Sequence, residues 1–217
     1  RSSAASDVYK RQYDGKVVID HLSFTVRPGV VTGFLGPNGA GKSTTMRLIV
    51  GLDRPTSGDA MIGGVSYVDL VRPLTVVGAL LDAGATHKGR SAYDHLLALA
   101  QTQRIARSRV DEVLELVGLR EVAHDRVGGF SLGMGQRLGL AAALLGDPPV
   151  LILDEPVNGL DPDGIMWIRK LVIHLAGEGR TILISSHLMS EMAATATDLI
   201  VIGRGRLIAA CTTDEFI

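Results

Sequence analysis

A glycine-rich loop between an apolar run and an amphipathic segment constrains this chain more than any other feature. The loop reads Gly36-Pro37-Asn38-Gly39-Ala40-Gly41-Lys42-Ser43-Thr44 and fits the pattern G-x-x-x-x-G-K-[S/T]. Residues 30–35 are apolar and β-rich, which predicts a buried strand, and residues 43–50 have the spacing of a helix that ends at Gly51. Strand, glycine loop and helix in this order predict a phosphate cradle, whereas the alternative is a plain glycine turn before a helix.

The residue types in the loop match the needs of a nucleoside triphosphate. Glycines let backbone N–H groups approach the phosphates, and the positive end of the helix dipole attracts the same anion. We expect Lys42 to reach the β and γ phosphates and the Ser43 hydroxyl to bind Mg²⁺. The loop therefore predicts binding of a nucleoside triphosphate together with Mg²⁺.

A pair of carboxylates follows a second apolar run. Residues 150–153 form a continuous apolar stretch, typical of a strand that is buried on both faces, and Asp154 and Glu155 come directly after it. We expect Asp154 to hold Mg²⁺, directly or through water, and Glu155 to orient and deprotonate the attacking water. The alternative is that the two carboxylates are only the polar end of a strand.

Composition limits the class of protein. With 217 residues, the chain suits one large domain or a core with an inserted subdomain. A net charge of −1 gives no general attraction to nucleic acid or to an anionic membrane. The single cysteine, Cys211, excludes an internal disulfide and suits a reducing compartment. No apolar run approaches the roughly 20 residues of a membrane span, so we expect no direct span and a membrane role only through a partner.

Periodicity along the chain predicts an α/β fold. We expect a P-loop NTPase core with a mainly parallel sheet, an N-terminal antiparallel β subdomain and an inserted α-helical subdomain. Strands are predicted over residues 17–19 and 22–26, with a turn at Asp20-His21, and over 59–62, 76–81, 181–185, 199–202 and 206–209. Helices are predicted from Ser91, from a cap at Ser108, and over residues 162–176 and 188–196.

The two ends of the chain carry their own expectations. Residues 1–12 look like translated adapter sequence, so we expect a non-native segment there, with a natural first strand as the alternative. The domain then covers residues 13–217, with the helical insertion at about 88–146. Residues 213–217 resemble the start of a helix, and the native C-terminus is expected to be missing.

These residues resemble the ATP-binding cassette (ABC) family, the ATPase subunits of ABC transporters, over about residues 13–217. In that family a signature, usually written LSGGQ, precedes the strand that ends in Asp-Glu. Residues 132–136 match more of its letters, but residues 130–134 keep its serine, and the family's spacing to the Asp selects the second register. The signature is then carried by Ser131, Leu132, Gly133 and Met134.

The resemblance implies roles for three further residues. Asp161 matches the carboxylate of the D-loop, which lies at the contact between two cassettes. His187 matches the switch histidine that touches the γ phosphate, although a histidine in this place is ordinarily only a residue at a helix start. Tyr13 matches the aromatic residue that stacks on adenine.

The chain also departs from the family pattern. Leu132 replaces a glycine, Met134 replaces a glutamine, and Asp82 stands where the family usually has the glutamine of the Q-loop. This combination resembles the bacterial branch that exports drugs and antibiotics. We expect Asp82 to join the Mg²⁺ shell and to link ATP to the permease, with a solvated carboxylate at a strand end as the alternative.

The resemblance implies a mechanism and partners. Two cassettes, identical or related, pair head to tail and hold ATP between the phosphate loop of one and the signature of the other. Hydrolysis would drive a separate membrane-spanning permease that exports a small molecule such as a drug, an antibiotic or a lipid-like compound. The chain would then be peripheral, at the cytoplasmic face of the inner or plasma membrane.

Two other classes share this chemistry. An ABC-type ATPase of nucleic-acid repair carries coiled coils or DNA-binding domains between phosphate loop and signature, whereas residues 44–130 show no heptads and no basic stripe. No nucleic-acid partner is therefore expected. A regulatory nucleotide-binding module would be expected to lose the base or the switch histidine, and here both Glu155 and His187 are present. The sequence therefore favours a transport ATPase.

Overall fold

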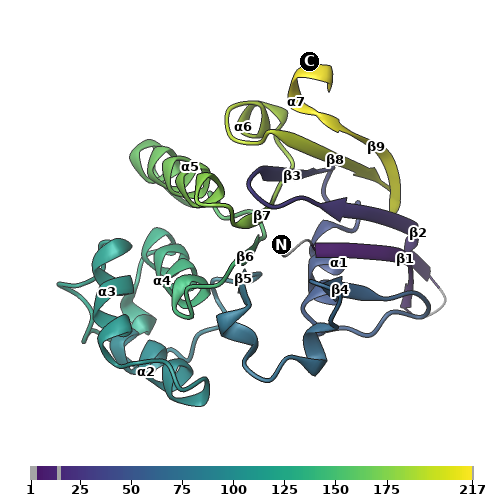
Figure 1. Ribbon diagram of the computed structural model, residues 1–217. Coiled ribbons are helices and arrows are strands. Elements are labelled where there is room, and N and C mark those ends of the chain that lie inside the picture. The colour runs from purple at the N-terminus through teal and green to yellow at the C-terminus, as the bar shows by residue number, and fades with distance from the viewer. Residues whose placement is uncertain (1–3, 14–15, 217) are drawn as a thin grey trace.

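The computed structural model describes residues 4–13 and 16–216 (Figure 1). Its strands are β1 (Ala4–Tyr13), β2 (Lys16–Val26), β3 (Val31–Leu35), β4 (Ala60–Ile62), β5 (Val77–Leu80), β6 (Val150–Leu153), β7 (Thr181–Ser186), β8 (Asp198–Gly203) and β9 (Arg206–Thr212). Its α-helices are α1 (Lys42–Ile49), α2 (Ala92–Thr102), α3 (Ser108–Leu116), α4 (Leu132–Leu144), α5 (Pro162–Gly177), α6 (Met189–Ala193) and α7 (Thr213–Phe216). Short 3₁₀ turns lie at Tyr67–Asp69, Pro73–Thr75 and Val127–Gly129.

A six-stranded sheet forms the centre of the fold. Its order is β5-β6-β7-β3-β8-β9, and the first five of these strands are parallel to one another, while β9 runs antiparallel to β8. Every residue of β3, β6 and β7 is buried. Continuous apolar strands of this kind need cover on both faces of the sheet, which confirms the predicted mainly parallel core.

Helices supply that cover from two sides. Because successive side chains of a strand point to opposite faces, Leu151 and Leu153 join a core with α4 and α5, whereas Val150 and Ile152 join a core with α1 and β2. Figure 1 shows α5 and α1 on opposite sides of the sheet. The sheet is therefore sandwiched between two apolar layers.

The N-terminal subdomain is a three-stranded antiparallel sheet of order β2-β1-β4. It is tied to the core by the rings of Phe24 on β2 and Phe34 on β3, whose centroids lie 5.3 Å apart. The predicted turn at Asp20-His21 is wrong. His21 takes a left-handed φ of 52°. Leu22 and Asp20 pair with consecutive residues of β1, so His21 between them is an extra residue without a partner on β1. It is therefore a bulge inside one continuous strand.

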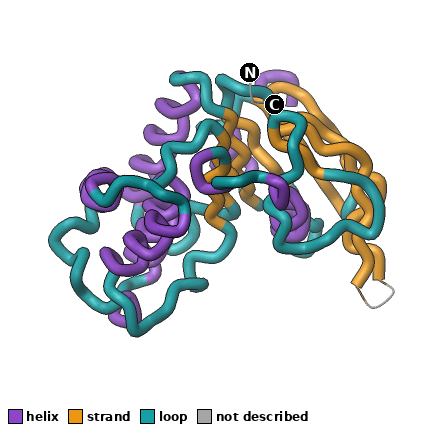
Figure 2. Tube along the Cα trace, turned by 60° about the horizontal axis from the view of Figure 1, so that its bottom comes forward, coloured by secondary structure: helices purple, strands orange, loops and turns teal. Residues whose placement is uncertain are grey.

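The helical subdomain occupies the chain between β5 and β6. Its α2 begins after Ser91, which confirms the predicted helix start, and the Ser91 hydroxyl caps the helix by accepting a hydrogen bond from the Asp94 N–H. Figure 2 shows its helices gathered on the side of the molecule opposite to the strands of the β subdomain. The helices α2, α3 and α4 pack on one another, and α4 also packs against β5.

Three other details differ from the sequence-based expectation. Residues 4–13 form β1, for which the favoured interpretation predicted no element, so this segment takes part in the fold, and its origin stays a prediction. Ser108 lies inside α3 and Arg107 holds the cap position. The helix expected over 188–196 ends at Ala193, because Ala196 and Thr197 already lead into β8, with Thr197 N–H bonded to the Val31 carbonyl.

The packing of α4 on β5 generates the first prediction. A Cβ at Gly78 would lie 1.9 Å from the Ala143 carbonyl oxygen, so Gly78→Ala forces the helix away from the strand. We expect a loss of at least about 1–3 kcal/mol in the free energy of unfolding, measured by denaturant titration. The control is Gly177→Ala, since a Cβ there meets nothing within 4 Å. Equal stabilities of the two variants would contradict this packing.

Candidate functional site

The residues singled out by the sequence converge on one edge of the central sheet. The phosphate loop follows β3, Asp154 and Glu155 follow β6, and His187 follows β7. Since β6, β7 and β3 are neighbouring parallel strands, their carboxyl ends meet. In open α/β sheets, ligands bind in the crevice outside these ends.

The phosphate loop has the backbone that anion binding requires. Gly41 stands at the N-cap position of α1 with a left-handed φ of 106°, and a Cβ there would lie 2.6 Å from the Ile19 Cδ1 atom. Any larger residue would be both strained and crowded. The loop thereby directs backbone N–H groups and the positive end of the helix dipole toward the same point.

Lys42 is held inside this loop. Its side chain is only 6% exposed, and its Nζ donates a hydrogen bond to the Gly36 carbonyl at 2.7 Å. The same nitrogen lies 3.4 Å from Glu155 Oε1. A desolvated ammonium requires an anion nearby, and a single carboxylate supplies it here.

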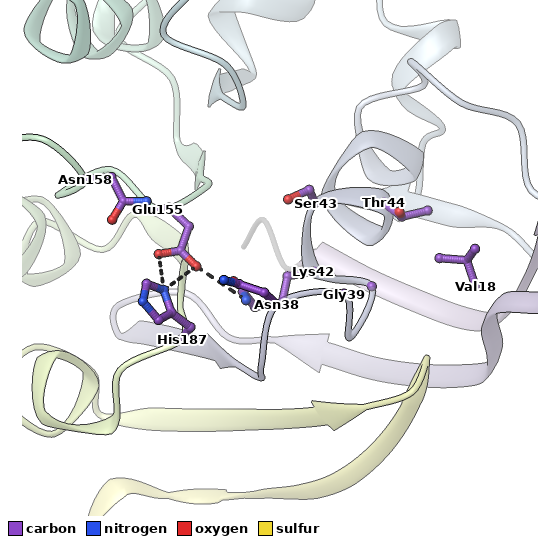
Figure 3. Close-up of a pocket in the computed structure, with 10 residues that line it drawn as sticks. Val18, Asn38, Gly39, Lys42, Ser43, Thr44, Glu155, Asn158 and His187 are labelled. Atoms are coloured by element: carbon purple, nitrogen blue, oxygen red, sulfur yellow. Dashed lines mark hydrogen bonds and ion pairs between the residues drawn. The ribbon is translucent and has the colours of Figure 1, made fainter. Parts of the chain in front are cut away.

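Glu155 connects the phosphate loop to the histidine after β7. Its two carboxylate oxygens lie 3.1 and 3.0 Å from His187 Nδ1, so the carboxylate stands between the ammonium and the imidazole (Figure 3). Its backbone has a left-handed φ of 46°, which costs a non-glycine residue about 1–3 kcal/mol. Strain of this kind persists only where the surroundings fix it, and it is typical of functional sites.

Ser185 fixes both carboxylate residues from the neighbouring strand. Its hydroxyl donates to Asp154 Oδ1 and accepts the Glu155 N–H at 2.8 Å. The residue is 1% exposed. We did not predict this role for Ser185, and the available signal was a serine at the end of a buried apolar strand.

A cavity of about 270 Å³ opens between these groups. Its lining comprises Val18, Asn38, Gly39, Gly41, Lys42, Ser43, Thr44, Glu155, Asn158 and His187. Two lining residues, Val18 and Asn158, were not predicted. Asn158 follows the Asp-Glu pair closely enough to have been considered, whereas Val18 reaches the cavity only through the packing of β2.

Two further predicted residues, Asp82 and Asp161, do not line this cavity. Asp82 follows β5, and its Oδ1 accepts the Gly84 N–H at 2.8 Å. Asp161 caps α5 by accepting the Gly164 N–H at 3.1 Å. Tyr13 ends β1, and its side chain lies outside the part that the structure describes.

The signature residues form the first turn of α4. Ser131 caps the helix and accepts the Met134 N–H at 3.2 Å, and Leu132 and Gly133 follow it. Ser131 and Leu132 line a separate hollow of about 210 Å³. The signature residues therefore line a different hollow from the phosphate loop of the same chain.

The fold and the site together define a P-loop nucleotide-binding domain. The model of the family described as ABC transporter matches residues 19–158. The chain belongs to the ABC transporter family, as an ATP-binding domain. This confirms the resemblance that the phosphate loop, the signature and the Asp-Glu strand indicated.

Curated relatives and a solved structure agree with this membership. The chain is 47% identical to an uncharacterised ABC transporter ATP-binding protein, YhcH, of Bacillus subtilis (strain 168), over 89% of this chain and 65% of that protein. It is 43% identical to the bacitracin transport ATP-binding protein BcrA of Bacillus licheniformis, over 91% of this chain and 66% of that protein. An ATP-binding subunit of an ABC transporter superposes with a TM-score of 0.88 at 25% identity, covering 99% of this chain and 91% of that one.

The first two of these relatives are longer than the chain, which spans about two thirds of their length. A lantibiotic transport ATP-binding protein, SrtF, of Streptococcus pyogenes is 37% identical over 92% of this chain and 86% of its own length. The similarity to SrtF thus extends over nearly the whole of both chains.

The geometry of Lys42 generates the second prediction. Lys42→Ala removes the buried cation nearest to the phosphates, so detectable ATP binding by calorimetry should be lost. The control is Lys170→Ala, on the exposed face of α5, which should leave the affinity unchanged. Wild-type affinity in Lys42→Ala would contradict the assignment of the phosphate loop.

Proposed function

We propose that this chain is the ATP-binding and ATP-hydrolysing subunit of an exporter, and that it powers a separate membrane permease. The observation that carries the proposal is the convergence of Lys42, Glu155 and His187 on one cavity at the carboxyl edge of the sheet. ATP hydrolysis needs a cation that binds the phosphates, a carboxylate that activates the water and a group that orients this carboxylate. Lys42, Glu155 and His187 can supply these in turn.

The protein's own residues fit a partial Mg²⁺ shell. Ser43 offers an exposed hydroxyl at the cavity, and Asp154 offers a carboxylate whose Oδ1 is held by Ser185. Within residues 4–13 and 16–216, no group of three or more His, Cys, Asp or Glu side chains could hold a metal. This fits Mg²⁺, which is usually bound by one or two protein oxygens together with phosphates and water. When bound, the ion neutralises charge on the β and γ oxygens.

Glu155 serves as the general base. When the nucleotide binds, the Lys42 ammonium pairs with the phosphates instead of with Glu155. The Glu155 carboxylate is then free to accept a proton from a water molecule. The water oxygen then attacks the γ phosphorus, and the bond between this phosphorus and the leaving ADP oxygen breaks. His187, which lies 3.0 Å from Glu155 Oε2, keeps the carboxylate directed at the cavity. As the counterpart of the switch histidine, it would also contact the γ phosphate.

A second cassette completes the site. In this chain Ser131 and Asp161 lie at the starts of α4 and α5, and neither residue lines the phosphate cavity. We infer that they act in the site of a partner cassette, in a homodimer or in a heterodimer with a related chain. ATP is then sandwiched between two chains.

The membrane part of the exporter is a separate permease. Within the described residues, no helix has the length and apolarity to cross a bilayer. We place the chain peripherally at the cytoplasmic face of the inner or plasma membrane. Relatives named for bacitracin and lantibiotic transport favour an antibiotic or a similar small molecule as cargo. The permease, rather than this chain, would select the compound.

The third prediction tests the base. Glu155→Gln keeps the size of the side chain but removes its basicity, so ATP should still bind while hydrolysis falls by roughly 10²–10⁴-fold. Glu178→Gln, on the surface at the end of α5, is the control and should hydrolyse ATP at the wild-type rate. Near-wild-type hydrolysis by Glu155→Gln in a phosphate-release assay would remove Glu155 from this role.

The fourth prediction concerns Asp82. We propose that it joins the Mg²⁺ shell through water and links the site to the permease, although its carboxylate here bonds to the Gly84 N–H. Asp82→Ala should leave ATP affinity within about threefold but strongly reduce the stimulation of hydrolysis by the permease. Asp82→Gln should retain more of the stimulation by the permease than Asp82→Ala does. Full stimulation of Asp82→Ala, measured with permease in vesicles, would contradict this link.

A further inference from the structure

Gln136, on the second turn of α4, contacts the loop that carries the base. We call residues Glu155–Leu160 the base loop. The Gln136 side-chain nitrogen donates to the Asn158 carbonyl at 3.1 Å and to the Glu155 carbonyl at 3.5 Å. The residue is 7% exposed. One buried amide therefore bridges the signature helix and two backbone carbonyls of the base loop.

The orientation of this amide follows from its partners. Both contacts are carbonyl oxygens, which only accept, so the Gln136 nitrogen must face them. Its Oε1 is then buried, and it finds no hydrogen-bond partner among the residues that the structure describes. A buried acceptor without a partner is unfavourable, and an apolar residue would avoid the cost. The presence of the amide is therefore better explained by its hydrogen bonds to the two base-loop carbonyls than by a contribution to the stability of the fold.

The base loop needs such a contact because of its backbone. Glu155 has a left-handed φ of 46°, and its carbonyl also accepts the Asn158 N–H at 3.1 Å. Fixing the Glu155 carbonyl fixes the peptide plane that follows it. Together with the Glu155 N–H, which donates to Ser185, it sets the direction of the side chain toward Lys42 and His187.

A second contact joins the same two segments. Leu132, in the first turn of α4, lies against Gly159, where a Cβ would come within 2.2 Å of the Leu132 Cδ2 atom. Gly133 also faces the base loop, since a Cβ there would lie 3.4 Å from the Gly159 oxygen. Leu132, Gly133 and Gln136, on the first two turns of α4, therefore all contact the base loop.

We propose that Gln136 is a positioning residue for Glu155. Through the Glu155 and Asn158 carbonyls it holds the base loop in the geometry that presents the carboxylate to the cavity. Ser131 caps the same helix and would act in the ATP site of the partner cassette. Gln136 therefore also connects Glu155, in the ATP site of this chain, to the signature that serves the partner's site. The inference rests on the proposed role of Glu155 as the base.

The test compares two glutamines. Gln136→Met keeps the length of the side chain and removes the amide, so kcat for ATP should fall by roughly 10–100-fold. KM should stay within about threefold, because the phosphate loop is untouched. The control is Gln103→Met, the same change at the C-cap of α2, where Gln103 Oε1 accepts the Leu74 N–H. This variant should keep the wild-type kcat within about twofold.

A double-mutant cycle separates positioning from a general structural effect. If Gln136 acts through Glu155, Gln136→Met should change single-turnover hydrolysis less than about twofold in the Glu155→Gln background. Should Gln136→Met fail to fold, Gln136→Leu takes its place, since it also lacks the amide and adds no buried charge.

The outcomes are distinguishable. A wild-type kcat in Gln136→Met, or the same fold-loss in both backgrounds, overturns the inference while leaving Glu155 as the base. Near-wild-type hydrolysis by Glu155→Gln alone contradicts the proposed function, and the inference with it. A loss that appears only when Glu155 is intact supports the positioning role.

Discussion

The contact between the buried Lys42 ammonium and the Glu155 carboxylate governs the rest of this site. An ammonium that is 6% exposed has lost most of its hydration, which is costly unless an anion replaces the water. Glu155 supplies one negative charge at 3.4 Å and shares it with His187. The phosphates of ATP carry more charge and also meet the backbone N–H groups of the loop, so they compete well for the ammonium. Under the proposed function, binding of ATP would therefore also free Glu155 from Lys42.

The sheet order makes this contact possible. Because β3 lies beside β7, and β7 beside β6, residues more than a hundred positions apart in the chain meet at one edge. Ser185 at the end of β7 then fixes Asp154 and the Glu155 backbone, and Gln136 fixes the loop beyond them. Glu155 is thus held by Ser185 on one side and by Gln136 on the other, which explains how its left-handed backbone is maintained.

The elements of this protein that depend on local sequence pattern could be predicted from the sequence. The phosphate loop, the buried strands and the start of a helix at Ser91 follow from neighbouring residues, and the structure contains all three. The pattern at His21 predicts a turn, because a bulge and a reversal look alike in sequence unless the partner strand, here within residues 4–13, is known. Ser185 and Gln136 act through contacts between distant segments, which local spacing does not reveal, whereas Asn158 lies only three residues after Glu155.

The most direct test is a structure of the chain with Mg²⁺ and a non-hydrolysable ATP analogue. The account predicts that the Lys42 Nζ leaves Glu155 for the β and γ phosphates, with the carboxylate turned to the space beside the γ phosphorus. A nucleotide bound elsewhere, or a Lys42 that stays paired with Glu155 while the phosphates are in place, would contradict it.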